Sequence, residues 1–152
     1  MTAHQPLRVL IVEDEVLLAA ELEYLVAASG AEPVGHAMSS PEAVDLAARL
    51  RPDLALVDVH LSDGPTGIDA ARTMTAHCGA IVLFITANMK RLPDDLAGAC
   101  GVMSKPYSEH QIRTALAFIE TCMKTGHAMG PAPQGLILSP TFARLWDAPA
   151  AA

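Results

Sequence analysis

The chain has 152 residues, 51% of them apolar and 4% aromatic, and its formal net charge at pH 7 is -7. This length fits one domain that buries its own core without a metal or disulfide staple. The acidic balance, without any cluster of Lys and Arg to displace counterions from phosphates, argues against binding of nucleic acid.

Five short apolar runs predict buried β-strands. Four of the runs are nearly continuous rather than alternating, which is typical of strands that are covered on both faces of a parallel sheet, whereas residues 32–37 include Glu32 and His36. The runs span residues 7–12, 32–37, 54–57, 80–85 and 101–103.

The segments between these runs carry helix signals. Apolar residues recur at helical spacing, and Ser108 with Gln111 forms a capping-box pair before the last helix. Pro93 and Gly98 predict that any helix within residues 88–100 is short or irregular. The predicted helices span residues 15–29, 40–50, about 66–77, and 108 to about 123.

Alternating strands and helices predict an α/β fold, a doubly wound five-stranded parallel sheet with helices on both faces. Ligands bind such sheets outside the carboxyl ends of the strands. Polar side chains follow four of the five runs at that edge: Glu13, Asp14, Asp58, Thr86 and Lys105.

These residue types predict a site for a metal ion and an anion. Carboxylates brought together repel one another, and a divalent cation such as Mg²⁺ relieves the repulsion. The hydroxyl of Thr86 and the ammonium of Lys105 suit an anion beside the metal. The combination indicates metal-assisted phosphoryl chemistry.

The C-terminal part of the chain divides into two segments after a domain that spans residues 1–125. Residues 126–135 are rich in Gly and Pro and predict a linker. Residues 136–152 form an extension that is too apolar for a solvated tail, and Ser139 with Pro140 can begin a short helix. We expect the extension to bury Trp146 against its own domain or in a homodimer contact.

Cysteines and histidines show no ligand spacing. Cys78, Cys100 and Cys122 are far apart in sequence and are interpreted as buried apolar side chains. The absence of a signal-like start and of a membrane-length apolar stretch predicts a protein of the cytoplasm that does not enter membranes. The histidines are scattered and interpreted as surface residues: His4, His36, His60, His77, His110 and His127.

Taken in order, these motifs resemble the receiver domain of bacterial two-component response regulators, over residues 7–125. The resemblance rests on an acidic pair after the first strand, Asp58 after the third, Thr86 after the fourth and Lys105-Pro106 after the fifth. It implies a flavodoxin-like strand order 2-1-3-4-5. It also implies that Asp58 accepts a phosphoryl group from a phosphohistidine of a sensor histidine kinase or a phosphotransfer protein.

The resemblance assigns a role to each site residue. Asp14 and Asp58 would hold Mg²⁺ directly, Glu13 through a water molecule, and His60 through its backbone carbonyl. Lys105 would pair with Asp58 at rest and with a phosphoryl oxygen after transfer, and the Thr86 hydroxyl would donate to another oxygen. The Lys105-Pro106 bond is often cis in the family.

One position departs from the usual receiver pattern. Receivers usually carry Tyr or Phe three residues before the Lys, and Val102 stands there. Tyr107 could substitute for that aromatic switch. Residues 84–87 (Phe-Ile-Thr-Ala) also resemble the Phe-Ala-Thr-Gly pattern of a receiver subgroup without the switch.

The leading hypothesis is a single-domain response regulator that catalyses only its own phosphoryl acceptance and autodephosphorylation. It would signal through a downstream protein or act as a phosphate shuttle or sink. A phosphatase of the haloacid dehalogenase type needs Asp where His60 stands, and a flavodoxin-like carrier would meet repulsion from Glu13, Asp14 and Glu15. A phosphorylation-independent interaction module remains open because of Val102.

Overall fold

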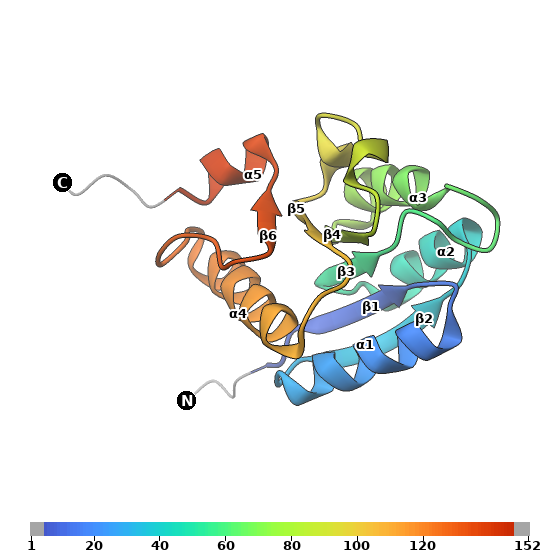
Figure 1. Ribbon diagram of the computed structural model, residues 1–152, viewed down its shortest axis with the longest axis horizontal. Helices are drawn as coiled ribbons and strands as arrows, with labels where there is room; N and C mark the ends of the chain where they lie inside the picture. Colours follow the sequence, from blue (N-terminus) through green and yellow to red (C-terminus); the bar gives the residue numbers. More distant parts are fainter. Residues whose placement is uncertain (1–4, 148–152) are drawn as a thin grey trace.

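Strands and helices alternate along the chain in the computed structural model, which describes residues 5–147 (Figure 1). The strands are β1 (Arg8–Val12), β2 (Glu32–Ala37), β3 (Leu54–Val57), β4 (Ile81–Thr86), β5 (Gly101–Ser104) and β6 (Leu136–Leu138). The helices are α1 (Val16–Ala28), α2 (Ser40–Leu50), α3 (Gly67–Thr73), α4 (Glu109–Thr125) and α5 (Pro140–Leu145).

Within residues 5–147 the strands form a six-stranded sheet in the order β2-β1-β3-β4-β5-β6. Strands β1 to β5 pair in parallel and confirm the predicted order 2-1-3-4-5. The prediction of five strands was incomplete, because β6 pairs antiparallel with the outer edge of β5. Leu136–Leu138 follow a Gly- and Pro-rich segment, outside the alternation of strands and helices, so the sequence pattern does not place them in the sheet.

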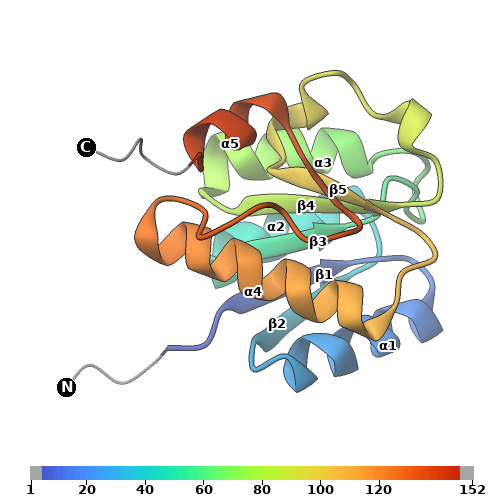
Figure 2. The same cartoon turned by 60° about the vertical axis from the view of Figure 1, so that its left-hand side comes forward.

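Helices cover both faces of the sheet, as predicted (Figure 2). Val9 and Ile11 of β1 belong to a core shared with α1 and α4, whereas Leu10 and Val12 belong to a second core shared with α2 and α3. Successive side chains of a strand point to opposite faces, so a strand between two helix layers must be apolar at every position. This explains the continuous runs.

Serine side chains cap the starts of α2 and α4, and the cap of α4 is the predicted one. The Ser39 side chain accepts from the backbone NH of Glu42 at the start of α2. Ser108 and Gln111 form a complete capping box at the start of α4. The third helix differs from its prediction in its second half, since α3 continues as a π-helical turn over Met74–Cys78.

Residues 88–100 are irregular, as predicted. The segment contains short 3-10 turns at Met89–Arg91 and Leu96–Gly98. Leu96 and Ala97 have positive φ values of 50° and 54°, a conformation that side chains with a Cβ rarely adopt. The guanidinium of Arg72 on α3 pairs with both carboxylate oxygens of Asp95, at 3.0 and 3.2 Å, and holds the segment against α3.

The C-terminal extension packs against its own domain. Ser139 caps α5 by accepting from the backbone NH of Phe142, and Trp146 is 4% exposed within the core beside α4. The intramolecular alternative predicted for Trp146 is therefore confirmed. Residues 148–152 of the predicted extension lie outside the described residues, and the division at residues 125 and 135 stays a prediction.

Candidate functional site

The acidic pair and Asp58 meet at the carboxyl edge of the sheet. Strands β1 and β3 are neighbours with Val12 opposite Val57, so the residues that follow them come together. Carboxylate oxygens of Glu13, Asp14 and Asp58 lie within 4.8 Å of one another. An all-oxygen set of acidic ligands suits a hard divalent cation, and Mg²⁺ fits these residues better than a thiolate- or imidazole-seeking metal.

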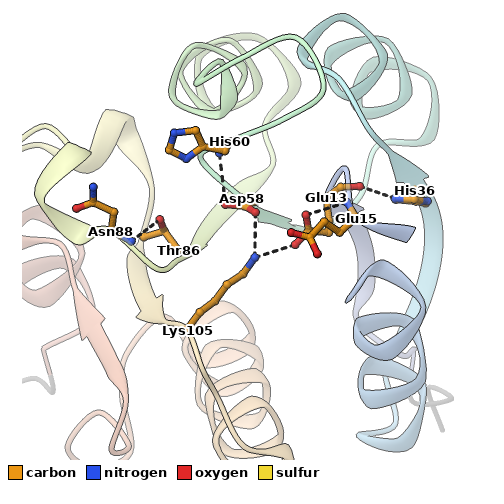
Figure 3. Close-up of polar contacts among 8 residues, drawn as sticks. All are labelled: Glu13, Glu15, His36, Asp58, His60, Thr86, Asn88 and Lys105. Carbon is orange, nitrogen blue, oxygen red and sulfur yellow. Dashed lines mark hydrogen bonds and ion pairs between the residues drawn. The ribbon is translucent and has the colours of Figure 1, made fainter. Parts of the chain in front are cut away.

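Lys105 reaches the same cluster from the end of β5. Its Nζ lies 2.9 Å from Oε1 of Glu13 and 2.9 Å from Oδ2 of Asp58 (Figure 3). The Lys105 side chain is 19% exposed, against 13% for Asp58 and 1% for Glu13. The Lys105-Pro106 bond is cis, as the resemblance implies. The predicted pairing of Lys105 with Asp58 is present.

The cluster holds three carboxylates and one ammonium, and burial and hydrogen bonds shift the pKa values of Glu13 and Lys105. Burial raises the pKa of the Glu13 carboxyl above its ordinary value, and hydrogen bonds from Lys105 and the backbone NH of Glu15 offset only part of the rise. Burial acts to lower the pKa of Lys105, but its hydrogen bonds to Glu13 and Asp58 outweigh burial and raise it. A second cation would therefore be favoured here.

Thr86 and His60 stand beside the cluster. Thr86 ends β4, which lies between β3 and β5, and its buried hydroxyl accepts from the backbone NH of Asn88 at 3.1 Å. The backbone NH of His60 lies 3.4 Å from Oδ1 of Asp58, and the His60 side chain is exposed. A metal-ligating role for the His60 carbonyl stays a prediction.

Two residues that sequence reasoning missed support the site. His36, interpreted above as a surface residue, is half-buried on β2, and its Nε2 lies 2.7 Å from the backbone oxygen of Glu13. Gly67 begins α3 against the backbone of Asp58, where no larger residue fits. The position of His36 could have been predicted from the strand order, because His36 lies near the end of β2, the strand beside β1. His4 lies outside the described residues.

An apolar hollow of about 300 Å³ adjoins Lys105. Leu18 and Glu21 of α1 line one side, and Ala87, Pro106 and Tyr107 line the other. Burial, with a contribution from the Glu21 carboxylate, raises the pKa of Tyr107 to about 12. Tyr107 is therefore a neutral, half-buried wall of this hollow at physiological pH.

Helix α1, which lines the hollow, also carries exposed apolar side chains. Val16, Leu17 and Tyr24 are 63%, 84% and 67% exposed. Large exposed apolar residues gathered on one helix mark a protein-contact surface more often than isolated ones do.

Comparison with known proteins identifies the family. Residues 9–117, more than half of the chain, match the model of the response regulator receiver domain. The chain belongs to this family. Receiver domains take part in two-component signalling, and the two curated relatives described below are named as regulators.

Several relatives of this receiver domain are known. It is 33% identical over 119 residues to the phyllosphere-induced regulator PhyR of Methylorubrum extorquens, a match that covers 77% of this chain and 45% of PhyR. It is 38% identical over 109 residues to the transcriptional regulatory protein PdtaR of Mycobacterium tuberculosis, covering 68% of this chain and 51% of PdtaR. The chain thus spans about half the length of these curated relatives.

A solved structure shares the architecture. The anti-anti-sigma factor PhyR from Bartonella quintana, solved as a doubly substituted mutant, matches the receiver domain with a TM-score of 0.65 and 33% identity. The match covers 77% of this chain and 51% of that chain. Val102, at the position of the usual aromatic, is buried opposite Phe84 of β4.

Proposed function

We propose that this receiver domain accepts a phosphoryl group on Asp58. The observation that carries the proposal is the bridging position of Lys105, whose Nζ lies 2.9 Å from Asp58 and 2.9 Å from Glu13 beside the acidic cluster. The Lys105 ammonium has three N–H donors and uses two of them for the carboxylates of Glu13 and Asp58, so a third donor can bind another anionic partner. A phosphoryl group on Asp58 would be that partner.

The transfer step is a displacement at phosphorus. An oxygen of the Asp58 carboxylate forms a bond to phosphorus, and the bond between phosphorus and the imidazole nitrogen of the donor phosphohistidine breaks. The imidazole leaves with the electron pair and takes up a proton. Hydrolysis of the resulting acyl phosphate returns Asp58 and inorganic phosphate, so the chain would turn over only its own modification.

Chain residues would perform three tasks in this step. Asp14 and Asp58, with Glu13 through a water molecule and His60 through its carbonyl, would hold Mg²⁺, which supplies charge neutralisation between the carboxylate and the phosphoryl group. Lys105 would pair with a phosphoryl oxygen. The Thr86 hydroxyl, whose oxygen accepts from the backbone NH of Asn88, would donate its proton in a hydrogen bond to a second phosphoryl oxygen.

Partners would be proteins. A sensor histidine kinase or phosphotransfer protein would dock on the apolar hollow, which adjoins Lys105, and on the exposed apolar side chains of α1, the helix that lines the hollow. The output would be a protein contact or a shuttle or sink of phosphate, in line with a relative described as an anti-anti-sigma factor. The described cysteines, Cys78, Cys100 and Cys122, are buried free thiols, which suits a reducing cytoplasm.

A second candidate function rests on Val102. A buried Val has no large ring to move between two positions, so a receiver domain with Val102 could bind partners regardless of phosphorylation. In that case Asp58→Asn would leave partner binding unchanged.

Labelling with acetyl phosphate and Mg²⁺ tests the proposal. Intact mass should increase by one phosphoryl group in the wild type and in the control variant Asp45→Asn, which alters an exposed carboxylate paired with Arg49. Asp58→Asn should remain unlabelled, as should the wild type without Mg²⁺. Labelling of Asp58→Asn at the wild-type level would refute the assignment.

A further inference from the structure

The C-terminal arm, defined here as β6 and α5 with Trp146 (residues 136–146), is attached to the domain along β5, at Trp146, and at Ser139, whose NH donates to the backbone oxygen of Cys100 at 2.8 Å. Leu136–Leu138 pair with β5 in the register Met103 to Leu136 and Gly101 to Leu138 (Figure 1). Trp146 attaches the C-terminal end of the arm, since its backbone oxygen accepts a hydrogen bond from the NH of Ala128 at 2.7 Å. The proposed function does not use this arm.

The fit between the arm and β5 is close. A Cβ at Gly101 would lie 2.5 Å from the backbone oxygen of Ile137, a separation that real side chains do not reach. The missing side chain of Gly101 therefore permits β6 to approach β5, and the contact leaves no room for a Cβ atom. Gly135, with a φ of 94°, turns the chain into β6 directly against the side chain of Gln111 on α4.

Strand β5 connects the arm to the candidate site. Lys105 directly follows β5, and its backbone NH donates to the oxygen of Thr86 at 2.9 Å. Met103, two residues before Lys105, is paired with Leu136 of the arm. The same short strand thus carries the ammonium that bridges Glu13 and Asp58 at one end and the arm along its edge.

We propose that the arm is a conformational device that responds to the state of Asp58, being firmly docked at rest and loosened after phosphorylation. This inference rests on the proposed function. After transfer Lys105 and Thr86 would both turn toward the phosphoryl oxygens, and the ends of β4 and β5 would move together. Strand β5 pairs with β4 over four residues and with β6 over only three. The pairing with β6 is therefore the weaker of the two, and we expect it to open first.

Hydrogen exchange read by mass spectrometry tests the device in the full chain. With acetyl phosphate and Mg²⁺, exchange in residues 136–146 should rise about fivefold or more, the lower end of typical coupling between sites. Trp146, the single tryptophan, should shift its emission to the red. Exchange in α2 should stay constant and serve as the internal reference, and Asp58→Asn should abolish the response.

The reciprocal measurement uses trifluoroberyllate with Mg²⁺, a stable mimic of a phosphoryl group on a carboxylate. Leu136→Ala removes a buried side chain of the arm, and Gly101→Ala pushes β6 away from the opposite side. Because coupling is reciprocal, both variants should bind the mimic about fivefold more tightly. Hydrogen exchange in α2 at the wild-type rate shows that a variant is folded. If one of the two variants does not fold, the other one provides the test.

The outcomes separate the two proposals. Complete phosphorylation with unchanged exchange and emission of the arm would overturn the device and leave phosphoryl acceptance intact. Unaltered affinity of both folded arm variants for the mimic would also overturn the device. Failure of the wild type to take up a phosphoryl group would overturn the proposed function and the device with it.

Discussion

Gly67 lies so close to Asp58 that a Cβ at Gly67 would overlap the backbone oxygen of Asp58, and it would lie 2.9 Å from the Cα of Val59. The backbone NH of Gly67 also donates to the oxygen of Val59 at 2.9 Å. The first residue of α3 thus presses on the turn that carries the proposed phosphoryl acceptor. Gly67 is required by close approach rather than by a positive φ.

Gly67→Ala should therefore destabilise the protein and displace Asp58. The added methyl group meets backbone atoms that cannot rotate away, and we expect a loss of about 3 kcal/mol in the free energy of unfolding. Denaturant unfolding measures it. Gly130→Ala is the matched control, since no heavy atom outside the neighbouring residues lies within 4 Å of its Cβ position. Equal effects of the two substitutions would contradict the assigned role of Gly67.

Lys105→Met should destabilise the metal-free protein. The substitution removes the cation between Glu13 and Asp58, and loss of hydrogen bonds to charged groups costs about 2 kcal/mol. Mg²⁺ should raise the melting temperature of this variant more than that of the wild type. Lys124→Met, which alters an exposed pair with Glu120 on α4, is the control and should respond to Mg²⁺ as the wild type does. An identical Mg²⁺ response of Lys105→Met and wild type would contradict a shared cation site.

Glu13 should give the metal-free protein a specific pH dependence. Its pKa is raised in the folded state, so between the ordinary value of 4.5 and the raised value the folded state holds more protons than the unfolded chain. The contribution of Glu13 to stability is thus present below pH 4.5 and is lost as pH rises through the raised pKa. Glu13→Gln lacks this loss.

The stability difference between Glu13→Gln and wild type should therefore move in favour of the variant as pH rises above 4.5. Denaturant unfolding at several pH values without Mg²⁺ measures this difference. The same linkage predicts that Mg²⁺ binds the wild type less tightly at acidic pH, where protonated Glu13 competes. A pH-independent difference would show that the Glu13 carboxyl titrates alike in the folded and unfolded protein.

His36 should matter for Mg²⁺ affinity through Glu13. Its Nε2 donates to the backbone oxygen of Glu13 and fixes the turn that carries both members of the acidic pair. His36→Leu, which has no donor, should weaken Mg²⁺ binding about fivefold, the equivalent of ~1 kcal/mol. His36→Gln places an amide nitrogen at a similar reach and should retain most of the affinity. Calorimetric titration measures the Mg²⁺ affinity of both variants. Equal losses of affinity in the two would show that His36 acts by packing and not through its hydrogen bond.

Strand ends made most of the site predictable. Glu13, Asp14, Asp58 and Lys105 each follow a continuous apolar run, and strand direction alone sends the ends of parallel strands to one edge. Contributions from outside the runs could not be predicted in this way. His36 acts through one ring nitrogen on a backbone oxygen, a contact that depends on the register of β1 against β2 and not on residue type.

The C-terminal arm shows the same limit. Its apolar composition predicted that Trp146 is buried, but composition does not tell an intramolecular from an intermolecular partner. The antiparallel pairing of β6 with β5 depends on an open strand edge and on the missing side chain of Gly101, which only the assembled sheet brings face to face with Ile137.

Local pattern by itself thus determined the five parallel strands, the helix caps and the chemical class of the site, because hydrophobic period and capping chemistry act within a few residues of one another. Tertiary structure alone decided the Lys105 bridge between Glu13 and Asp58, the support from His36 and Gly67, and the docking of the arm. These contacts join residues far apart in the chain, and their geometry is set by the register and packing of the whole sheet.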